Sequence, residues 1–477
     1  MADEAALAAR REAASLVTRL REAEPEILAL AGLDLGPALE QSLFGLLRPA
    51  DLAAPRARRP TRLGALMRLT MGLAGGLGAS RPAAGSVVAI GLSPAHPRIL
   101  EPISDELVGR GTAEPFLVRA AKLDVVAAGR RFRGARLSDL VDAEFVAPLI
   151  QHLHRLGRRL DRATRSWDEA SRLVSTEALR RGARDALARS GFEAACLLSI
   201  AARRPALMMS FNENGRWARL IPAAARRHGV LSLDIAHAEI VDAVAIQGAD
   251  FDRFAVFGAY SASTLQEAGI DPGRVVQVGA PRFDQLIRRA RTGDGRPERT
   301  IVVASQWLGG RMTASVKRAM LEMIFEAASS VAPVQIVVRL HPLEVDSTVQ
   351  ETLASLPPQA GVATRVERDG DLYDALEGAW AMVTGWSNAV FEAALLGVPS
   401  ICVNTTGGPL PLDLAGGIAS EAVTAEQLTS RLRQLLDDRE RSRALAAARD
   451  GLLPRLGPLD GHAAERAAGL ILKMIRG

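Results

Sequence analysis

Two apolar, strand-like runs in the second half of the chain end in residues that can bind phosphate. The run 334–340 is followed directly by His341 and Pro342, and a run that ends at Thr384 is followed by a glycine, a serine and an asparagine that open a helical pattern. An open α/β sheet binds nucleotides at the carboxyl ends of its strands, and the free backbone amides at the start of a helix attract anions. The two motifs together therefore predict a phosphate site.

The second motif supplies four candidate ligand-binding residues. Gly385 follows the strand, and Ser387 and Asn388 stand at the start of the helix, where a hydroxyl can accept from a backbone amide two or three residues on. Such a cap is enough to explain the serine, but the preceding strand and the partner motif favour an anion site. Glu392 lies one turn into the helix. It either accepts hydrogen bonds from ribose hydroxyls or faces solvent.

His341 is the histidine that we expect to act on a phosphate. An imidazole can donate a hydrogen bond to a donor phosphate and, when protonated, can neutralise or protonate a departing phosphate oxygen. A structural histidine held by Pro342 is the alternative. Ser305 and Gln306 follow another strand-like run, 300–304, and lead into a glycine turn whose amides can contact a phosphate or an acceptor. Both residues therefore join the predicted nucleotide site.

The first half of the chain has its own polar residues at strand ends. Glu213 and His237 follow strand-like runs, as do His96 and Asn212. A carboxylate at the rim of a cleft can be partly desolvated and act as the base on an acceptor hydroxyl. We therefore predict that Glu213 and His237 are catalytic. An exposed ion pair between Glu213 and Arg216 is the alternative for the carboxylate.

Several chemistries are disfavoured by the motifs that the sequence lacks. His152 and His154 lie in an arginine-rich helical stretch without the spacing of a metal site, and neither a GxSxG nor a GKS/T motif occurs. Zinc, serine-hydrolase and P-loop chemistry are therefore not expected. We predict a site without a metal ion or a cofactor.

The composition predicts a folded protein of two or three domains. The chain has 477 residues, of which 48% are hydrophobic and 24% charged, and this length exceeds one ordinary core. Only Lys122, Lys317 and Lys473 among the 59 basic residues are lysines, so the arginine bias is interpreted as genomic and the net charge of +5 carries little information. With aromatic residues at 4%, stacking platforms are missing, and the arginine runs are interpreted as solvated helix faces rather than nucleic-acid contacts.

Cysteine usage and hydropathy predict a cytoplasmic protein. Cys196 and Cys402 lie in apolar runs without disulfide or metal spacing, which is typical of a reducing compartment. The first residues are acidic and lack the apolar region of a signal peptide, and no run of about 20 uncharged apolar residues occurs. The apolar stretch 63–79 has basic flanks, so contact of the N-terminal helices with the inner face of the membrane or with a partner protein stays open.

Alternating strands and helices must position the candidate residues. From residue 86 onward, short apolar runs alternate with helical patterns, which predicts parallel sheets, and the run 194–200 is one of the predicted strands. The polar stretch 288–300 has the composition of an interdomain linker. We expect an α/β protein with a helical N-terminal extension (1–84), a Rossmann-like acceptor domain (85–290), a Rossmann-like donor domain (298–460) and a C-terminal helix (461–477) that packs back toward the first domain.

Three segments of the second half resemble the donor half of GT-B glycosyltransferases that build bacterial surface carbohydrates. They are Asp371 to Leu376, Thr384 to Pro399 and the pair His341-Pro342. The resemblance is to the members that combine an HP motif with a downstream serine motif: capsule Kdo transferases, bacterial sialyl- and polysialyltransferases, and CDP-glycerol glycerophosphotransferases.

The first half of the chain fits the same resemblance. Its segments 229–237, 254–260 and 278–284 look like the strand, histidine, strand and VGxPRxD succession of these enzymes. The resemblance covers about residues 86–460 and is strongest over 334–403. It leaves the helical N-terminus unexplained.

The resemblance implies a metal-independent glycosyltransferase with two facing Rossmann-like domains. In that family the HP histidine and the serine motif bind the nucleotide phosphate, which would assign His341, Ser387 and Asn388 to the donor. Several members use CMP-activated acidic sugars. The resemblance therefore implies transfer of a nonulosonic acid or Kdo from a CMP-sugar, ahead of a UDP-sugar, to a glycan, lipid or protein acceptor.

The chain departs from the family at two places. The usual Gln-His-Gly is Ala236-His237-Ala238, and the second of the paired serines is Asn388. Two other classes of function stay open. A non-hydrolysing UDP-N-acetylhexosamine 2-epimerase shares the two facing domains and acts on a sugar nucleotide without an acceptor. A non-catalytic nucleotide-sugar-binding or scaffold protein would use its N-terminal helices to dock a partner.

Overall fold

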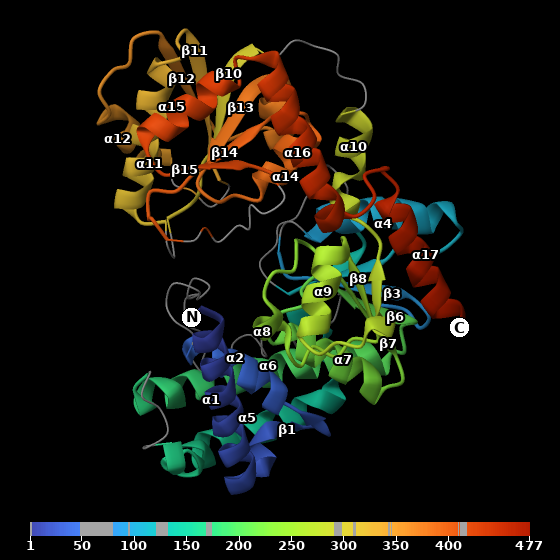
Figure 1. Cartoon of the computed structure of the whole chain (residues 1–477). Coiled ribbons are helices and arrows are strands. Elements are labelled where there is room, and N and C mark those ends of the chain that lie inside the picture. Colours follow the sequence, from blue (N-terminus) through green and yellow to red (C-terminus); the bar gives the residue numbers. More distant parts are fainter. Residues whose placement is uncertain are drawn as a thin grey trace. The chain divides into compact units, whose positions relative to one another are not determined.

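The chain folds into two compact units in the computed structural model, which describes residues 2–47, 80–93, 96–120, 132–167, 174–290, 298–308, 312–341, 344, 346–408, 410 and 417–477 (Figure 1). The first unit comprises Met1–Arg282 together with His462–Gly477, and the second comprises Phe283–Gly461. Both ends of the chain thus belong to the first unit. Pro342 of the predicted phosphate motif and the apolar stretch 63–79 lie outside the described residues.

A parallel sheet of seven strands forms the centre of the first unit. The strand order is β5–β4–β3–β6–β7–β8–β9, and all neighbouring pairs are parallel. The strands are β3 (Val87–Gly91), β4 (Phe116–Arg119), β5 (Gly134–Arg136), β6 (Leu207–Ser210), β7 (Leu231–Ile235), β8 (Arg253–Val256) and β9 (Val275–Gln277). The chain adds β4 and β5 on one side of β3 and then β6 to β9 on the other. The strand order therefore reverses between β3 and β6, and open α/β sheets bind ligands at the carboxyl ends beside such a reversal.

The N-terminal helices are packed into the first unit. Its helices are α1 (Ala2–Ala23), α2 (Gly36–Leu47), α4 (His96–Gly109), α5 (Ala143–Ala163), α6 (Thr176–Ala202), α7 (Trp217–Arg227), α8 (Ala243–Ile246), α9 (Ala259–Glu267) and α17 (Ala463–Arg476). Short 3-10 turns η1 (Pro25–Leu28), η3 (Leu137–Leu140), η4 (Arg165–Trp167), η5 (Pro272–Arg274) and η6 (Pro281–Phe283) and a hairpin of β1 (Ala29–Leu30) and β2 (Leu33–Asp34) complete it. Buried Arg10 of α1 donates hydrogen bonds to Gln41 of α2 and to the backbone carbonyl of Gln247, so polar contacts join these helices to the loop before β8.

The C-terminal helix α17 packs on α4 (Figure 1). Ala467 and Ile471 of α17 share a core with Ile103 of α4, and Arg466 Nε donates to the backbone carbonyl of Val278 at 2.8 Å. These contacts attach residues 462–477 to the first unit.

The run 194–200 is not the strand that its composition predicted, because it is the buried end of α6. All residues from Ser190 to Ala201 are buried. A helix buried on every side shows the same continuous apolar run as a buried strand, so periodicity alone does not separate them. Cys196 accordingly lies in a helix, and Cys402 lies in a strand of the second unit.

A parallel sheet of six strands forms the second unit. The strand order is β12–β11–β10–β13–β14–β15, with every neighbouring pair parallel. The strands are β10 (Glu298–Ala304), β11 (Val334–Arg339), β12 (Val362–Glu367), β13 (Ala379–Thr384), β14 (Ser400–Val403) and β15 (Ser420–Ala422). Here the order reverses between β10 and β13.

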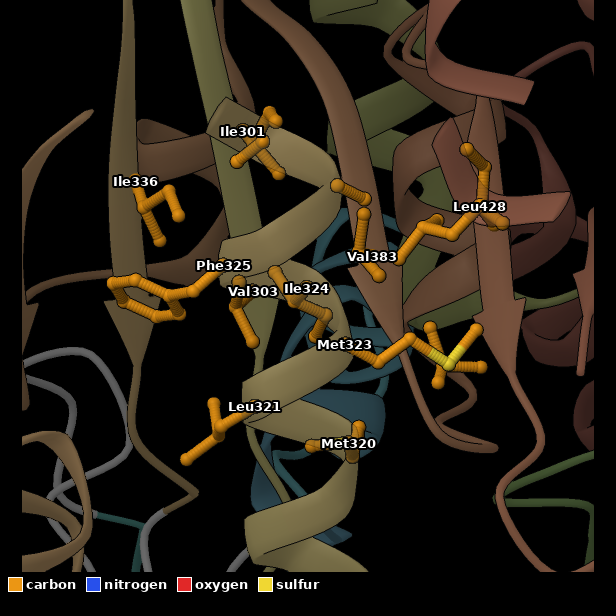
Figure 2. Close-up of a cluster of buried hydrophobic side chains, with 14 of the residues drawn as sticks. Ile301, Val303, Met320, Leu321, Met323, Ile324, Phe325, Ile336, Val383 and Leu428 are labelled. Carbon is orange, nitrogen blue, oxygen red and sulfur yellow. The ribbon is translucent and has the colours of Figure 1, made fainter. Parts of the chain in front are cut away.

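Helix α11 covers one face of this second sheet (Figure 2). The helices of the unit are α10 (Asp284–Ala290), α11 (Ala314–Ser329), α12 (Asp346–Ala354), α13 (Leu372–Leu376), α14 (Ala389–Leu395), α15 (Ala425–Gln434) and α16 (Asp438–Leu456). Ile301, Val303, Ile336 and Val383 of the strands pack in one cluster with Leu321, Ile324 and Phe325 of α11. Strands covered in this way read as continuous apolar runs, which is why the sequence revealed them.

Across the part of the chain that the structure describes, no helix is both long and apolar enough to cross a membrane.

Candidate functional site

The second unit gathers its predicted ligand-binding residues at three neighbouring strand ends. Ser305 and Gln306 follow β10, His341 follows β11, and Gly385 and Ser387 follow β13. These strands are adjacent in the order β11–β10–β13. The residues therefore lie along the carboxyl edge of the sheet, beside the reversal of strand order.

The Ser305 hydroxyl forms a hydrogen bond to another side chain of the protein. Ser305 is 5% exposed, and its Oγ donates to Oε1 of Glu344 at 2.8 Å. A hydroxyl has one hydrogen to donate, so Ser305 has none left for a phosphate while this bond holds.

Gln306 and Gly385 hold the ends of β10 and β13 close together. Oε1 of Gln306 accepts the backbone N–H of Trp386 at 3.0 Å. A Cβ built on Gly385 would lie 2.4 Å from this Oε1. The absence of a side chain at Gly385 therefore has a structural reason: it leaves room for the Gln306 amide.

The start of α14 is a short helical turn, with its serine bonded locally. Oγ of Ser387 accepts the N–H of Ala389 at 3.2 Å, two residues on, as the capping alternative predicted. Asn388 occupies the N-cap position without a side-chain capping bond, and the helix has only seven residues. Glu392 is 9% exposed, so the alternative in which it faces solvent is wrong.

His341 is half-buried and held by its backbone. Its N–H donates to Oε2 of Glu344 at 2.9 Å. Burial, and to a smaller extent the positive charge of Lys317, lower the pKa of His341 below its ordinary value. At neutral pH the imidazole is therefore predominantly uncharged, and it acts first as a hydrogen-bonding group.

Two residues of this region, Lys317 and Glu344, were not predicted to belong to the site. Lys317 is 1% exposed, forms an ion pair with Glu344 and donates to the backbone carbonyl of Gln306 at 2.7 Å. Burial lowers the pKa of Lys317 to about 8. One signal in the sequence pointed to it: Lys317 is one of only three lysines in a chain whose other 56 basic residues are arginines.

The first unit brings Glu213 and His237 together beside its own reversal of strand order. Glu213 follows β6 and His237 follows β7, the next strand in the sheet. Oε2 of Glu213 lies 3.6 Å from Nδ1 of His237, and both atoms are buried without a hydrogen-bond partner among the described residues. Arg216 forms its ion pair with Glu193 of α6, so the predicted alternative of a Glu213–Arg216 pair is wrong.

His96 and Asp234 complete the surroundings of this pair. The ring of His96, at the start of α4, lies 5.4 Å from that of His237, and its Nδ1 accepts the N–H of Leu92 at 3.1 Å. Burial, and then the nearby His237, lower the pKa of His96 to about 3, so it stays neutral. Burial, and then the charge of Glu213, raise the pKa of the Asp234 carboxyl well above its usual range.

The first site thus combines two carboxyl groups and two imidazoles, which are side chains able to take up and release protons. Burial favours the neutral forms of Asp234 and His96, and Glu213 and His237 are the other two members of the group. Within the described ranges, no three side chains of His, Cys, Asp or Glu come together in a way that would hold a metal ion.

No protein-family model matches the sequence, and no curated protein matches it significantly. Solved structures do resemble the fold. The UDP-GlcNAc 2-epimerase from Neisseria meningitidis bound to UDP-GlcNAc aligns with a TM-score of 0.52 and 13% identity, over 81% of this chain and 100% of that one. The UDP-GlcNAc 2-epimerase from Methanocaldococcus jannaschii aligns with a TM-score of 0.51 and 10% identity, over 81% and 99%.

A third structure, of the wall teichoic acid polymerase TagF, aligns with a TM-score of 0.49 and 10% identity, over 87% of this chain and 94% of that one. Identities this low report on the fold alone. The predicted fold class is confirmed: the chain has the GT-B fold, built from two Rossmann-like units with parallel sheets and additional helices.

Proposed function

We propose that the protein is a glycosyltransferase that moves a sugar from a nucleotide-activated donor to a hydroxyl group of an acceptor. The observation that supports it most directly is the placement of polar side chains in both units at the carboxyl ends beside the reversal of strand order. Open α/β sheets bind their ligands at that position. One such site suits a nucleotide phosphate, and the other suits proton transfer.

The donor belongs in the second unit under this proposal. Its strand ends present His341, the Gln306 side chain and the backbone around Ser387, which are neutral hydrogen-bonding groups rather than free cations. A neutral imidazole can donate to a phosphate oxygen and can take up a proton as charge develops on the leaving group. Asn388 and Glu392 complete the set of residues proposed to contact the nucleotide.

The acceptor belongs in the first unit, where Glu213 and His237 act as a pair. The side chain of His237 is 30% exposed and that of Glu213 only 6%. A ligand therefore reaches the imidazole first, and the carboxylate behind Nδ1 favours the imidazolium that forms when the ring takes a proton. The sequence proposed Glu213 as the base. In the pair, His237 accordingly takes the proton from the acceptor, and Glu213 stabilises the charge that forms on the ring.

In the proposed transfer, one bond forms and one bond breaks at the anomeric carbon of the donor sugar. The acceptor loses its hydroxyl proton to the Glu213–His237 pair while its oxygen forms a bond to the anomeric carbon of the donor sugar. The bond between that carbon and the phosphate oxygen breaks, and the nucleotide leaves with the electron pair. His341 stabilises the charge on the departing phosphate.

The donor class follows from the family resemblance. A CMP-activated acidic sugar, a nonulosonic acid or Kdo, is proposed ahead of a UDP-sugar, with a glycan, lipid or protein as acceptor in the synthesis of a surface carbohydrate. The enzyme would work in the cytoplasm, with the option of contact to the inner face of the membrane through its N-terminal helices.

A second candidate is an enzyme of the UDP-N-acetylhexosamine 2-epimerase type. The alignments with two such epimerases, which cover 99% and 100% of their chains, favour it at the level of the fold. The two candidates differ in their need for an acceptor. Turnover of a UDP-sugar with no acceptor present would favour the epimerase.

The proposal is tested first with a thermal-shift panel of CMP, CDP, UDP, GDP and their sugars. We expect a nucleotide to raise the melting temperature, since a ligand that binds only the folded state stabilises it. A chain that responds to none of them would instead be a non-catalytic scaffold.

The catalytic roles are tested in a transfer assay with the donor that the panel identifies. His341→Ala should fold normally and lose about 100-fold or more in kcat, because one preorganised donor to a developing charge contributes that much. Glu213→Gln should bind donor as the wild type does and transfer at a reduced rate. Near-wild-type turnover by either variant would remove the role assigned to that residue.

A further inference from the structure

A buried carboxylate in the second unit connects the ends of two neighbouring strands. The side chain of Glu344, in the loop after β11, is 2% exposed. Its Oε1 accepts a hydrogen bond from Ser305 Oγ at 2.8 Å, and its Oε2 accepts one from the backbone N–H of His341 at 2.9 Å. The backbone N–H of Glu344 also donates to the carbonyl of His341 at 2.8 Å. One side chain thus joins the end of β10 to the backbone that carries the predicted catalytic histidine.

Lys317, near the start of α11, extends the connection to a third strand. Its ammonium pairs with Oε1 of Glu344 and donates to the backbone carbonyl of Gln306 at 2.7 Å. The Gln306 side chain in turn accepts the N–H of Trp386 at 3.0 Å. A continuous network of polar contacts therefore links the ends of β10, β11 and β13.

We propose that Lys317 and Glu344 are positioning residues, which hold the three strand-end loops of the second unit in the arrangement that binds the donor phosphate. This inference rests on the proposed function of the second unit as the donor site. With side chains only 1% and 2% exposed, neither residue contacts the ligand. Both act through the backbone groups that they bind, the N–H of His341 and the carbonyl of Gln306.

A role in stability alone would leave a different signature. A buried ion pair pays a large desolvation penalty, and replacing both of its members by apolar residues of similar size is often neutral or stabilising. The thioether of methionine, however, is only a weak acceptor and does not replace the carboxylate oxygen that accepts the N–H of His341. Removal of both charges should therefore leave the fold intact and release the His341 loop.

The network also acts on the charge state of His341. Its pKa is lowered by burial first and by the Lys317 charge second. Lys317→Met removes the second cause only. An NMR titration of the His341 ring should therefore show a higher pKa in this variant, and an unchanged titration would show that the Lys317 charge does not act on the ring.

The test compares three double variants by calorimetric titration with CMP, CDP and UDP, and by thermal unfolding. In Lys317→Met/Glu344→Met we expect a melting temperature near that of the wild type and a loss of nucleotide affinity of about tenfold or more. In Lys317→Met/Glu344→Gln the amide oxygen can still accept from His341, so affinity should stay within about threefold. The matched control is Arg318→Met/Glu322→Met, which removes an exposed ion pair of 2.8 Å from the same helix.

Wild-type affinity in Lys317→Met/Glu344→Met would overturn the proposal. If that variant does not fold, Glu344→Asp decides, because aspartate keeps the charge beside Lys317 and is too short to reach the His341 amide. Wild-type affinity in this variant would equally overturn the proposal.

The failure of the proposed function is a separate outcome. If wild-type protein binds none of the three nucleotides, the donor-site assignment fails. The positioning role is then read from hydrogen exchange of the His341 amide. Exchange about tenfold faster in Glu344→Asp supports it, and unchanged exchange overturns it.

Discussion

Replacing Gly385 by alanine tests whether the close approach between the ends of β10 and β13 is needed for nucleotide binding. A Cβ at this position would lie 2.4 Å from Oε1 of Gln306, where ordinary contacts begin at 3.4 Å. The same oxygen accepts the N–H of Trp386 at 3.0 Å. The Gln306 amide must therefore move by about 1 Å to restore an ordinary contact, and its bond to Trp386 breaks.

The size of the effect follows from that broken bond. A part-buried amide that loses its acceptor costs about 1–2 kcal/mol. Under our proposal the nucleotide binds the arrangement in which this bond is intact, so binding must restore it, and the same energy corresponds to about 5- to 30-fold in the binding constant. Gly385 is not among the residues with positive φ, so a left-handed backbone adds nothing to this cost. We expect Gly385→Ala to weaken nucleotide binding by this factor and to expose the Trp386 amide to faster hydrogen exchange.

The assay is calorimetric titration with the nucleotide that gives the largest thermal shift in the wild type. Gly408→Ala is the matched control, since Gly408 follows β14 at the same edge of the sheet and a Cβ there would meet no atom within 4 Å. In a Gln306→Ala background, where the clashing amide is gone, Gly385→Ala should cost less than about 0.5 kcal/mol. Wild-type affinity for Gly385→Ala, or an equal penalty in both backgrounds, would refute the reasoning.

Two further predictions concern the first unit. Asp234→Asn should raise the melting temperature more at pH 8 than at pH 5. The pKa of the Asp234 carboxyl is raised in the folded protein, so the folded protein keeps a proton that the unfolded chain releases above its ordinary pKa of about 4. The stability of the wild type therefore falls with rising pH, whereas the asparagine of the variant stays neutral. A gap between variant and wild type that does not widen with pH would contradict this. Gly191→Ala should lower the melting temperature, since a Cβ would lie 2.6 Å from Cδ2 of His152 between α5 and α6. Overpacking costs about 1–3 kcal/mol and the higher helix propensity of alanine returns about 1 kcal/mol, so the net loss of stability is about 1 kcal/mol. Gly109→Ala is the control, because a Cβ at Gly109 would meet no atom within 4 Å. A higher melting temperature in Gly191→Ala would count against the packing argument.

The ends of the central strands of both units could be located from the sequence because these strands are buried on both faces. Such strands read as short apolar runs, and the first polar residue after each run marks its end. This placed His341 after β11 and His237 after β7. The same rule produced the wrong strand at 194–200, since the buried end of α6 has the same composition and only its long helical context distinguishes it.

The partners of the candidate residues were harder to predict. The alternative that the sequence left open for Glu213 was an exposed ion pair with Arg216. In the structure Arg216 pairs with Glu193 of α6, and Glu213 lies beside His237 on the neighbouring strand. Proximity along the chain does not predict the ion-pair partner here, since successive side chains in the turn between a strand and a helix point in different directions.

The sequence by itself located most strands of the two sheets and the polar residues that follow them, because the apolar run of a buried strand is formed by side chains that are neighbours along the chain. Only the tertiary structure decided the strand order, which sets β3 beside β6 and β10 beside β13 and so creates the two edges where the candidate residues meet. That order results from packing between segments far apart in the chain. Lys317 shows the difference most clearly. In the sequence it is distinguished only by being one of three lysines, and its burial against Glu344 exists only because α11 folds over the strands that it covers.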